Sequence, residues 1–156
     1  MTSDELREEI EIELESMAEM VRESVQLCRD VGDGTPTMRE KTAAGGFLAH
    51  FYNGVENILR RISRFYAVPL PEGGNWHVRL FRQFCEPDGH LPLLFDETLA
   101  AKIGPFRSFR HMFFHTYGFQ LDWQRMRTGI GQIEDIFWDF RNVVLLFLES
   151  LNQGQD

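Results

Sequence analysis

The sequence predicts an all-α protein, a four- or five-helix bundle with antiparallel neighbours. Three observations predict this fold. Apolar residues recur every three or four positions along several long segments, which gives each a single buried stripe when it is helical. No segment alternates apolar and polar residues as a half-buried strand does, and no repeat of fixed length is present. Clusters of glycine and proline separate the periodic segments, so each segment is expected to form its own helix.

The size and composition indicate one globular unit. A chain of 156 residues makes about one domain, so we expect residues 1–156 to form a single helical domain. The 43% of apolar and 26% of charged residues argue against a disordered chain. The strongest apolar run, residues 143–148, is far shorter than the ~20 residues of a membrane span. The acidic N-terminus is unlike a secretion signal, and the two cysteines have no metal-type spacing, so we expect a cytoplasmic protein with no membrane association.

The first half of the chain is expected to hold two long helices and a short one. The first helix is expected from Ser3, its N-cap, to Arg29. The breaker cluster at 31–36 ends it, and the second helix is expected over 38–67. After a loop rich in proline and glycine, a short amphipathic helix is expected over 76–84, and another loop over 86–92 follows.

The second half is expected to hold three more helical segments. A helix over 96–103 begins at a capping aspartate and is expected to break at the glycine before Pro105. Pro105 suits the first turn of the next helix, which is expected to run to about Tyr117. Gly118 is placed like a residue that terminates a helix. Asp122 then opens the last helix, which carries a long apolar stripe.

The charge is unevenly distributed. The formal net charge is 16 − 24 = −8, of which residues 1–30 contribute 3 − 10 = −7. Between Arg60 and Arg127 the balance is 10 − 6 = +4, so a basic surface can exist beside an acidic one. The total charge therefore neither supports nor excludes a nucleic-acid partner. We expect the acidic first helix to lie away from any cleft that binds RNA.

The segment 105–117 carries the groups with the most chemistry. Its charged and polar residues share one side of a helical wheel: Arg107, Ser108, Arg110, His111 and His115. The opposite side, expected to dock on the bundle, holds Phe109, Met112, Phe113 and Thr116. A guanidinium matches phosphate oxygens, and an imidazole moves a proton at neutral pH. The pattern therefore suits RNA cleavage in which a base activates the 2′-hydroxyl and arginine stabilises the anionic transition state.

The spacing of Arg110 and His115 favours a site made by two subunits. Five residues separate them by roughly 7.5 Å along a helix at ~1.5 Å per residue. One helix holds such a pair loosely, whereas two helices that meet across a twofold axis bring several copies into one cleft. We therefore expect a homodimer.

The motif Arg110-x4-His115-x-Tyr117 resembles the R-x4-H-x-Y signature of HEPN ribonuclease toxins of the HepT type. His111, directly after the arginine, also fits the HEPN pattern. The sharp match covers 110–117, while the chain length and the all-helical prediction agree with that family over nearly the whole chain. The resemblance implies a homodimeric toxin that cleaves RNA without a metal or a cofactor. Arg110 and His115 would take the family's catalytic positions.

The resemblance also implies a protein partner. In toxin pairs of this type a minimal nucleotidyltransferase antitoxin transfers AMP to the tyrosine of the motif, a role that falls on Tyr117. Added phosphate beside Arg110 would put negative charge where the substrate phosphate binds, which blocks the site. Arg107 and His111 are suggested by the helical wheel alone as further phosphate contacts.

Two other functions remain open at this point. The first is a catalytically silent HEPN bundle that binds a nucleotidyltransferase. The second is a metal-binding bundle, because His111 and His115 stand four residues apart, as two ligands on one helix face do. No third ligand can be identified, and no glutamate lies between the two histidines.

Polar residues outside the motif have simpler interpretations. A partial polar line on the second helix is explained by solvation or an intersubunit contact: His50, Asn53, Asn57 and Arg61. The arginine group Arg60, Arg61 and Arg64 either follows an RNA backbone or pairs with acids, as Arg60 does with Glu56 at helical spacing. Trp76 and His77 are interpreted as a capped helix start with a packing tryptophan, and a role in a cleft is the alternative.

Overall fold

The computed structural model describes residues 1–87 and 89–154. Its elements, in chain order, are α1 (Ser3–Val31), α2 (Met38–Phe65), α3 (Trp76–Gln83), α4 (Glu97–Phe113), the short 3₁₀ helix η1 (Gly118–Gln120) and α5 (Trp123–Gln153). The described residues contain five α-helices and no strand, so the all-α prediction is confirmed. The predicted loop over 86–92 includes residue 88, which lies outside the described residues.

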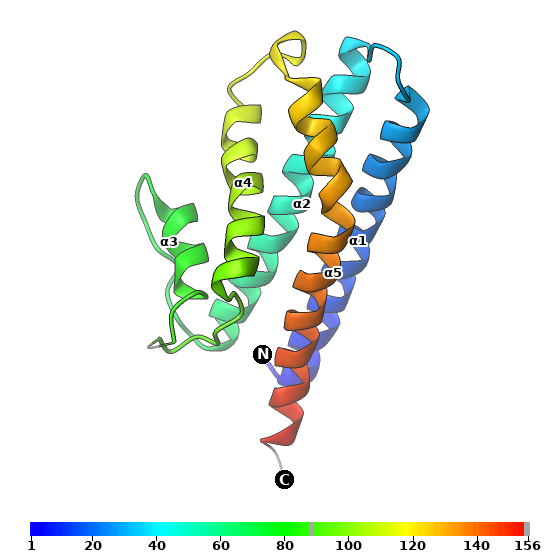
Figure 1. The fold of residues 1–156 in the computed structure, drawn as a ribbon. Helices are drawn as coiled ribbons and strands as arrows, with labels where there is room; N and C mark the ends of the chain where they lie inside the picture. Colours follow the sequence, from blue (N-terminus) through cyan, green and yellow to red (C-terminus); the bar gives the residue numbers. More distant parts are fainter. Residues whose placement is uncertain (88, 155–156) are drawn as a thin grey trace.

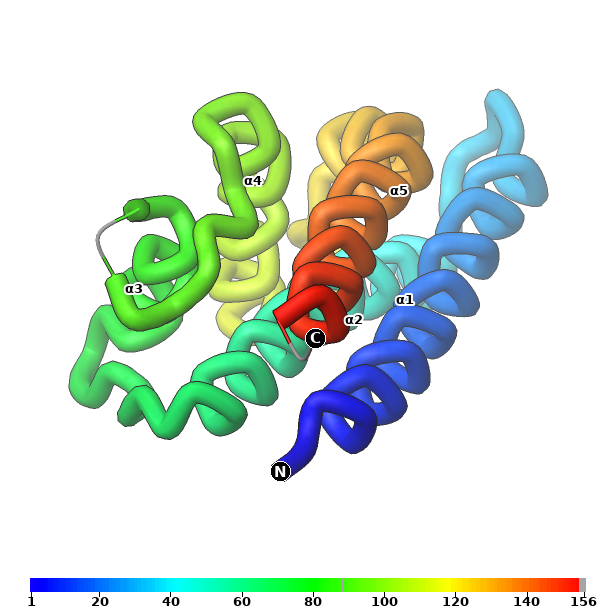
Figure 2. The backbone as a smooth tube through the Cα atoms, turned by 90° about the horizontal axis from the view of Figure 1, so that it is seen from below, coloured from blue at the N-terminus to red at the C-terminus, as the bar shows by residue number. Residues whose placement is uncertain are grey.

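The four long helices form an up-down-up-down bundle (Figure 1). Around the bundle, α1 packs on α2, α2 on α4, α4 on α5 and α5 on α1, and each of these neighbours is antiparallel. The view along the bundle shows α1 and α4 at opposite corners (Figure 2). The short α3 stands outside the four-helix core and packs on α2 (Figure 1). The acidic α1 is therefore separated from α4, which carries the motif arginine.

Side-chain caps set where the helices begin. Thr2, one residue before the predicted Ser3, accepts a hydrogen bond from the backbone of Glu5 and completes a capping box. Thr37 caps α2 in the same way. Asp96 accepts a hydrogen bond from the backbone N–H of Leu99 at the start of α4, as the sequence predicted for this aspartate.

The core holds α2 close to its neighbours. Its fully buried large side chains come from α1, α2, α3, α5 and the segment between α3 and α4: Leu6, Ile10, Met17, Phe51, Tyr52, Ile58, Leu59, Ile62, Leu80, Phe84, Phe95 and Phe140. Gly54 on α2 faces Met17 so closely that an added Cβ would lie 2.4 Å from the methionine Cγ. This contact fixes α2 against α1 next to the residues that form the candidate site.

The predicted helix break at Pro105 is wrong. α4 runs without interruption from Glu97 to Phe113, with Pro105 in its interior. A proline there removes one backbone hydrogen bond, to the carbonyl four residues earlier. Both Pro105 and that residue, Ala101, are exposed, so the unpaired carbonyl faces water. The buried Ile103 and Phe106 anchor the helix on either side of the proline, and the helix continues.

The predicted end of this helix is also wrong. α4 ends at Phe113, and the last turns tighten because His115 N–H donates to Met112 O at 3.0 Å and Thr116 N–H to Phe113 O at 3.3 Å. The wheel therefore does not apply to His115, Thr116 and Tyr117. Met112, expected to dock on the bundle, is 39% exposed. Phe109 and Phe113 pack against the core as predicted.

Gly118 does not terminate a helix. It begins η1 and touches the start of α2, where an added Cβ would lie 2.2 Å from Thr42 Oγ1. The Lys41 ammonium donates a hydrogen bond to Phe119 O at 3.3 Å in the same place. Glycine is needed here because the backbone after α4 approaches α2 closely. These contacts hold the segment after α4 against the bundle.

No helix in the described part of the chain has the length and apolar character that a bilayer crossing requires.

Candidate functional site

Arg110, in the last turn of α4, is held by a set of polar groups. Its Nη1 donates to Asn53 Oδ1 at 2.8 Å and to Glu56 Oε1 at 3.3 Å, both on α2. Its Nη2 lies 2.9 Å from Nδ1 and 3.1 Å from Nε2 of His77 on α3. The side chain is 13% exposed. Three helices therefore fix the position of one guanidinium.

Glu56 is the centre of this arrangement. Its carboxylate is almost completely buried on α2. Oε1 accepts from Arg110 and from Arg60 Nη2, each at 3.3 Å, and Oε2 lies 2.7 Å from His77 Nδ1. A buried carboxylate needs such partners, because its desolvation costs several kcal/mol. The two arginines and the histidine supply them.

His77 lies between Glu56 and Arg110. Its Nδ1 is 2.7 Å from the Glu56 carboxylate, which only accepts hydrogen bonds. Arg110 Nη2 lies almost equally far from both ring nitrogens, so it contacts the face of the imidazole and not one lone pair. The ring also lies against Trp76, with ring centroids 3.6 Å apart, and the Arg60 guanidinium lies 4.6 Å from the Trp76 ring centroid. Stacking thus fixes the orientation of His77.

The ring of Tyr52 lies against the guanidinium of Arg110. Arg110 Cζ is 5.5 Å from the centre of its ring, a distance at which a cation is attracted to the aromatic face. The hydroxyl is buried without a hydrogen bond of normal geometry in the described structure. Burial raises the pKa of Tyr52 to about 12, although the nearby Arg107 guanidinium favours the tyrosinate.

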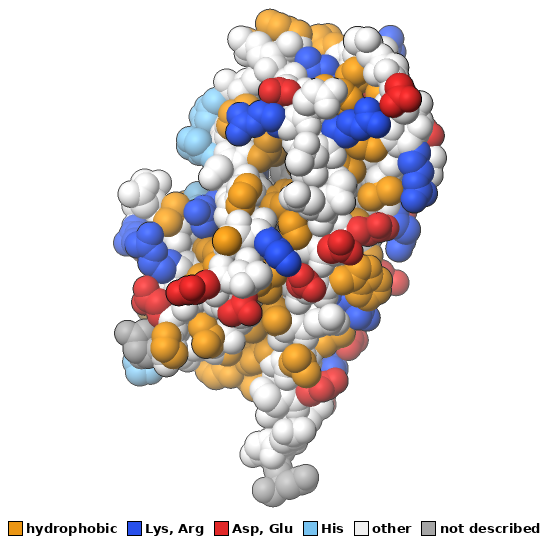
Figure 3. Space-filling model, in the orientation of Figure 1, with side chains coloured by type: hydrophobic (Ala, Val, Ile, Leu, Met, Phe, Trp, Pro, Cys, Tyr) orange, Lys and Arg blue, Asp and Glu red, His pale blue; other side chains and the backbone are white. Residues whose placement is uncertain are grey.

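The segment after α4 brings two imidazoles together at the surface. The rings of His111 and His115 have centroids 5.0 Å apart, and both side chains are exposed. In the face shown in Figure 3, histidine side chains gather at the edge of the molecule beside the carboxyl end of α4. The pair arises although the helix ends at Phe113, because the tightened turns carry His115 back toward His111.

Tyr117 and Phe119 extend this surface. Tyr117 is 72% exposed and Phe119 is 65% exposed. Their rings are parallel, with centroids 5.7 Å apart and an interplanar angle of 2°. Phe114, also 65% exposed, lies between the two histidines in the sequence. The hydroxyl of Tyr117 is therefore presented to solvent on a segment whose backbone is held against α2.

A family model described as HepT-like protein matches residues 43–151, which is more than two thirds of the chain. The chain belongs to the HepT-like family. No curated protein and no solved structure matches the HepT-like chain. The matched range contains α3, α4 and most of α2 and α5, and with them every residue of the Arg110 network. The family suggests that the chain is a HEPN-type component of a toxin–antitoxin pair.

The HepT-like chain brings together some of its predicted site residues and separates others. His111 and His115 are neighbours, and Tyr117 follows them on the same segment. Arg110 instead points to α2 and α3, and the described structure has no hydrogen bond between it and His115. Arg107 packs its guanidinium 5.3 Å from the centre of the Phe81 ring on α3. A single chain thus holds Arg110 in one group of side chains and the two histidines with Tyr117 in another, and it does not bring the two groups into one site.

Three residues that hold Arg110 were not predicted as site residues: Asn53, Glu56 and His77. Asn53 and His77 were explained by solvation and packing. Glu56 was noticed only as a partner of Arg60, a contact that the structure confirms at 3.3 Å. The available signal was a carboxylate and an amide three residues apart on the apolar face of α2, next to Tyr52 and Val55.

Metal ligands do not gather in the described part of the chain. Within residues 1–87 and 89–154, no three His, Cys, Asp or Glu side chains are placed to hold one metal ion. His111 and His115 thus form a pair of imidazoles without a third ligand in the single chain.

Because its hydroxyl is buried, Tyr52 is expected to ionise at a higher pH than an ordinary tyrosine. Below its ordinary pKa of 10.0 the hydroxyl is protonated in the folded and the unfolded chain alike. From there to about 12 the unfolded chain loses this proton and the folded chain keeps it, so the free energy of unfolding falls as the pH rises. A titration of tyrosinate absorbance should therefore show one tyrosine that ionises near pH 12, and Tyr52→Phe should remove that step.

Tyr66→Phe is the matched control for this titration and should leave the late step in place. Ionisation of all tyrosines together near the ordinary tyrosine pKa would contradict the burial of Tyr52.

Proposed function

We propose that this HepT-like chain is a metal-independent endoribonuclease that acts as a homodimer and serves as the toxin of a toxin–antitoxin pair. Arg110 and His115 are its catalytic residues, and His111 and Arg107 contact substrate phosphates. The observation that carries the proposal is the fixed Arg110 guanidinium beside a surface pair of imidazoles in a chain of this family.

The fixed position of the Arg110 guanidinium favours binding of an anion. A guanidinium has five N–H groups. The bonds to Asn53 and Glu56 use both hydrogens of Nη1, while Nη2 lies over the His77 ring. In this proposal a phosphate binds the hydrogens on Nε and Nη2. Because the orientation is already fixed, binding a phosphate costs little side-chain entropy, which is the condition for electrostatic stabilisation of a transition state.

His115 supplies the proton transfer. In the proposed reaction its imidazole takes the proton of the RNA 2′-hydroxyl, and the oxygen attacks the adjacent phosphorus. The bond from phosphorus to the 5′-oxygen breaks, and that oxygen takes up a proton. The products are a 2′,3′-cyclic phosphate end and a 5′-hydroxyl end. Arg110 stabilises the additional negative charge on the phosphorus oxygens during the attack.

A second subunit completes the site. In one chain Arg110 faces the bundle while His115 faces solvent. Two chains that meet through the carboxyl ends of α4 would place the His111–His115 pair of one subunit near the Arg110 network of the other. The exposed aromatic side chains on the same segment, Phe114, Tyr117 and Phe119, are apolar surface that such a contact can bury.

One observation favours a second function, a catalytically silent bundle that binds a nucleotidyltransferase. The Arg110 side chain is only 13% exposed and already has three partners. An arginine that is buried and hydrogen-bonded in this way can have a purely structural role. A cleavage assay separates the two functions.

We expect the purified protein to cleave RNA in the presence of EDTA and to leave cyclic phosphate ends. Arg110→Ala should lower the rate about 10²- to 10³-fold, since it removes transition-state stabilisation. His115→Ala should lower it about 10²- to 10⁴-fold, since it removes the base. Gel analysis of the RNA and of its ends measures both effects.

The controls are a histidine and an arginine outside the site. His90 is exposed in the loop before α4, and Arg22 pairs with Glu19 on α1. His90→Ala and Arg22→Ala should cleave like the wild type. If Arg110→Ala and His115→Ala, both folded, also cleave at the wild-type rate, these two residues are not the catalytic ones. A wild-type protein that cuts no RNA but binds a nucleotidyltransferase would support the silent bundle.

We further propose that a nucleotidyltransferase partner inactivates the chain by AMP transfer to Tyr117. The tyrosine oxygen attacks the α-phosphorus of ATP, pyrophosphate leaves, and the phenolic proton passes to a base of the transferase. The 72% exposure of Tyr117 supports its accessibility. Incubation with the cognate transferase and ATP should add AMP units to the intact mass, and Tyr117→Phe should abolish the addition.

Tyr66→Phe, which removes a tyrosine from the far end of α2, should accept AMP like the wild type. An adduct of unchanged mass and yield on Tyr117→Phe would place the modification on another residue.

A further inference from the structure

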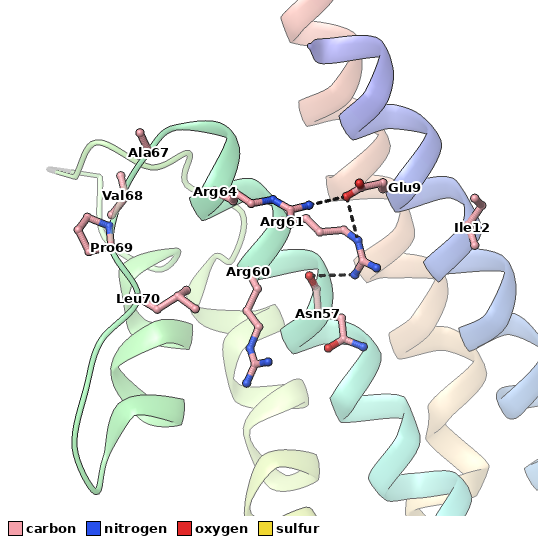
Figure 4. A pocket seen from close by; sticks show the side chains of 10 residues that line it. All are labelled: Glu9, Ile12, Asn57, Arg60, Arg61, Arg64, Ala67, Val68, Pro69 and Leu70. Atoms are coloured by element: carbon pink, nitrogen blue, oxygen red, sulfur yellow. Dashed lines mark hydrogen bonds and ion pairs between the residues drawn. The ribbon is translucent and has the colours of Figure 1, made fainter. Parts of the chain in front are cut away.

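A groove lined by arginines lies beside the Arg110 network. It runs between α1, α2 and the segment that follows α2 (Figure 4), with a volume of about 910 Å³. Arg60, Arg61 and Arg64 of α2 line it together with Glu9 of α1. These four side chains give the groove more positive than negative charge in a chain whose net charge is −8. An anionic partner is favoured at these three arginines. Because α1 forms one wall of the groove, a cleft that binds RNA here would not lie away from the acidic helix as expected.

Arg60 lines this groove from α2. Figure 4 shows its guanidinium directed away from Glu9, Arg61 and Arg64, with no bond to the other side chains drawn. Its hydrogen bond goes from Nη2 to Glu56 Oε1, at 3.3 Å, and its Nε is buried without a hydrogen-bond partner in the described structure, so only the Nη side of the guanidinium can reach a ligand. The side chain is 42% exposed and its flat face lies against Trp76. A planar cation held in this way is ready to bind a planar pair of anionic oxygens.

The Glu9 carboxylate lies between Arg61 and Arg64, at the position that an anionic ligand would take. Its Oε2 lies 3.3 Å from Arg61 Nε and 2.9 Å from Arg64 Nη2 (Figure 4). Arg61 has a second carboxylate, Glu13, at 3.1 Å. The Glu9 side chain is 39% exposed, so its bonds to the arginines compete with water and are weak. A ligand with more negative charge can displace this carboxylate.

The groove and the candidate site are connected through one buried residue. The same oxygen, Glu56 Oε1, accepts from Arg60 on the groove side and from Arg110 on the site side. Arg64 stands one further turn along α2, roughly 6 Å beyond Arg60 at ~1.5 Å per residue of backbone rise. The groove arginines therefore begin next to the residue that holds Arg110 and continue along α2.

We propose that this groove binds the phosphodiester backbone of the RNA strand on one side of the scissile linkage. Arg60 and Arg64 contact successive phosphates, and Glu9 weakens binding by competing for Arg61 and Arg64. The proposal rests on the proposed function, because it extends the strand that Arg110 holds. Backbone contacts of this kind are independent of sequence and depend on salt, because each bound phosphate releases counterions.

The test measures binding of a labelled single-stranded 2′-O-methyl RNA, which lacks the attacking hydroxyl and is not cleaved. Arg60→Gln and Arg64→Gln should each weaken binding, by roughly tenfold and fivefold. Each should lower the slope of log affinity against log salt by about 0.7, the value for one phosphate contact on a single strand. Glu9→Gln should act in the opposite direction and tighten binding by roughly fivefold.

Glu11→Gln is the matched control for Glu9→Gln. It removes the same charge from the same helix, but Glu11 pairs with Arg7 and does not line the groove. It should change the affinity far less than Glu9→Gln. A purely structural role of Glu9 would give weaker binding or none, and not the expected gain.

The proposal is overturned if wild-type protein does not bind the 2′-O-methyl RNA, or if the four variants bind it alike. It is also overturned if the variants alter binding of polyglutamate but not of RNA, because the groove would then receive an acidic protein segment. Cleavage is scored separately on unmodified RNA. If the wild type cleaves RNA but all variants bind the 2′-O-methyl RNA with wild-type affinity, the groove proposal is rejected and the ribonuclease proposal stands. If the variants change this affinity as expected but the wild type cleaves no RNA, the proposed ribonuclease activity is rejected.

Discussion

The Glu56 carboxylate is the interaction on which the arrangement of the site depends. It is buried on α2 and bound by Arg110 of α4, His77 of α3 and Arg60 of its own helix. Removing this charge from water costs several kcal/mol, and the three donors offset that cost only while all of them stay in place. The carboxylate therefore ties α3 and α4 to α2 at one point. The hydrogen bond with which Arg110 partners this buried carboxylate also fixes the direction of its guanidinium.

This constraint explains why the site has an inner and an outer part. Arg110 is held inside by polar groups, while the tightened turns after Phe113 carry His115 and Tyr117 to the surface. The guanidinium of Arg110 is thereby held in place, and the Tyr117 side chain is exposed to solvent. The network also connects Arg110 to the arginine groove, because Arg60 and Arg110 bind the same oxygen of Glu56.

Periodicity predicted the helices well, and it located the motif, but it did not reveal what the motif arginine touches. The all-α bundle and the start of α4 at Asp96 followed from apolar spacing and capping chemistry, which are local. The break at Pro105 was wrong because exposure of that turn, a tertiary property, makes the lost hydrogen bond tolerable. Asn53, Glu56 and His77 lie 33 to 57 residues from Arg110 in sequence, so no helical wheel relates them. The wheel placed His115 beside His111 correctly, but it failed for Tyr117, which it put next to Arg110, because the helix ends before that residue.

The central claim is that Glu56 fixes the guanidinium of Arg110 within a single chain. It is tested most directly by ¹⁵N NMR of the arginine side chains, with Arg110→Lys used to assign the Arg110 signals. A guanidinium bound on both Nη atoms rotates slowly, so the wild type should give two separate Nη signals for Arg110. In Glu56→Gln these signals should merge as rotation becomes free. Merged signals in the wild type, or two separate signals that persist unchanged in Glu56→Gln, would contradict the account.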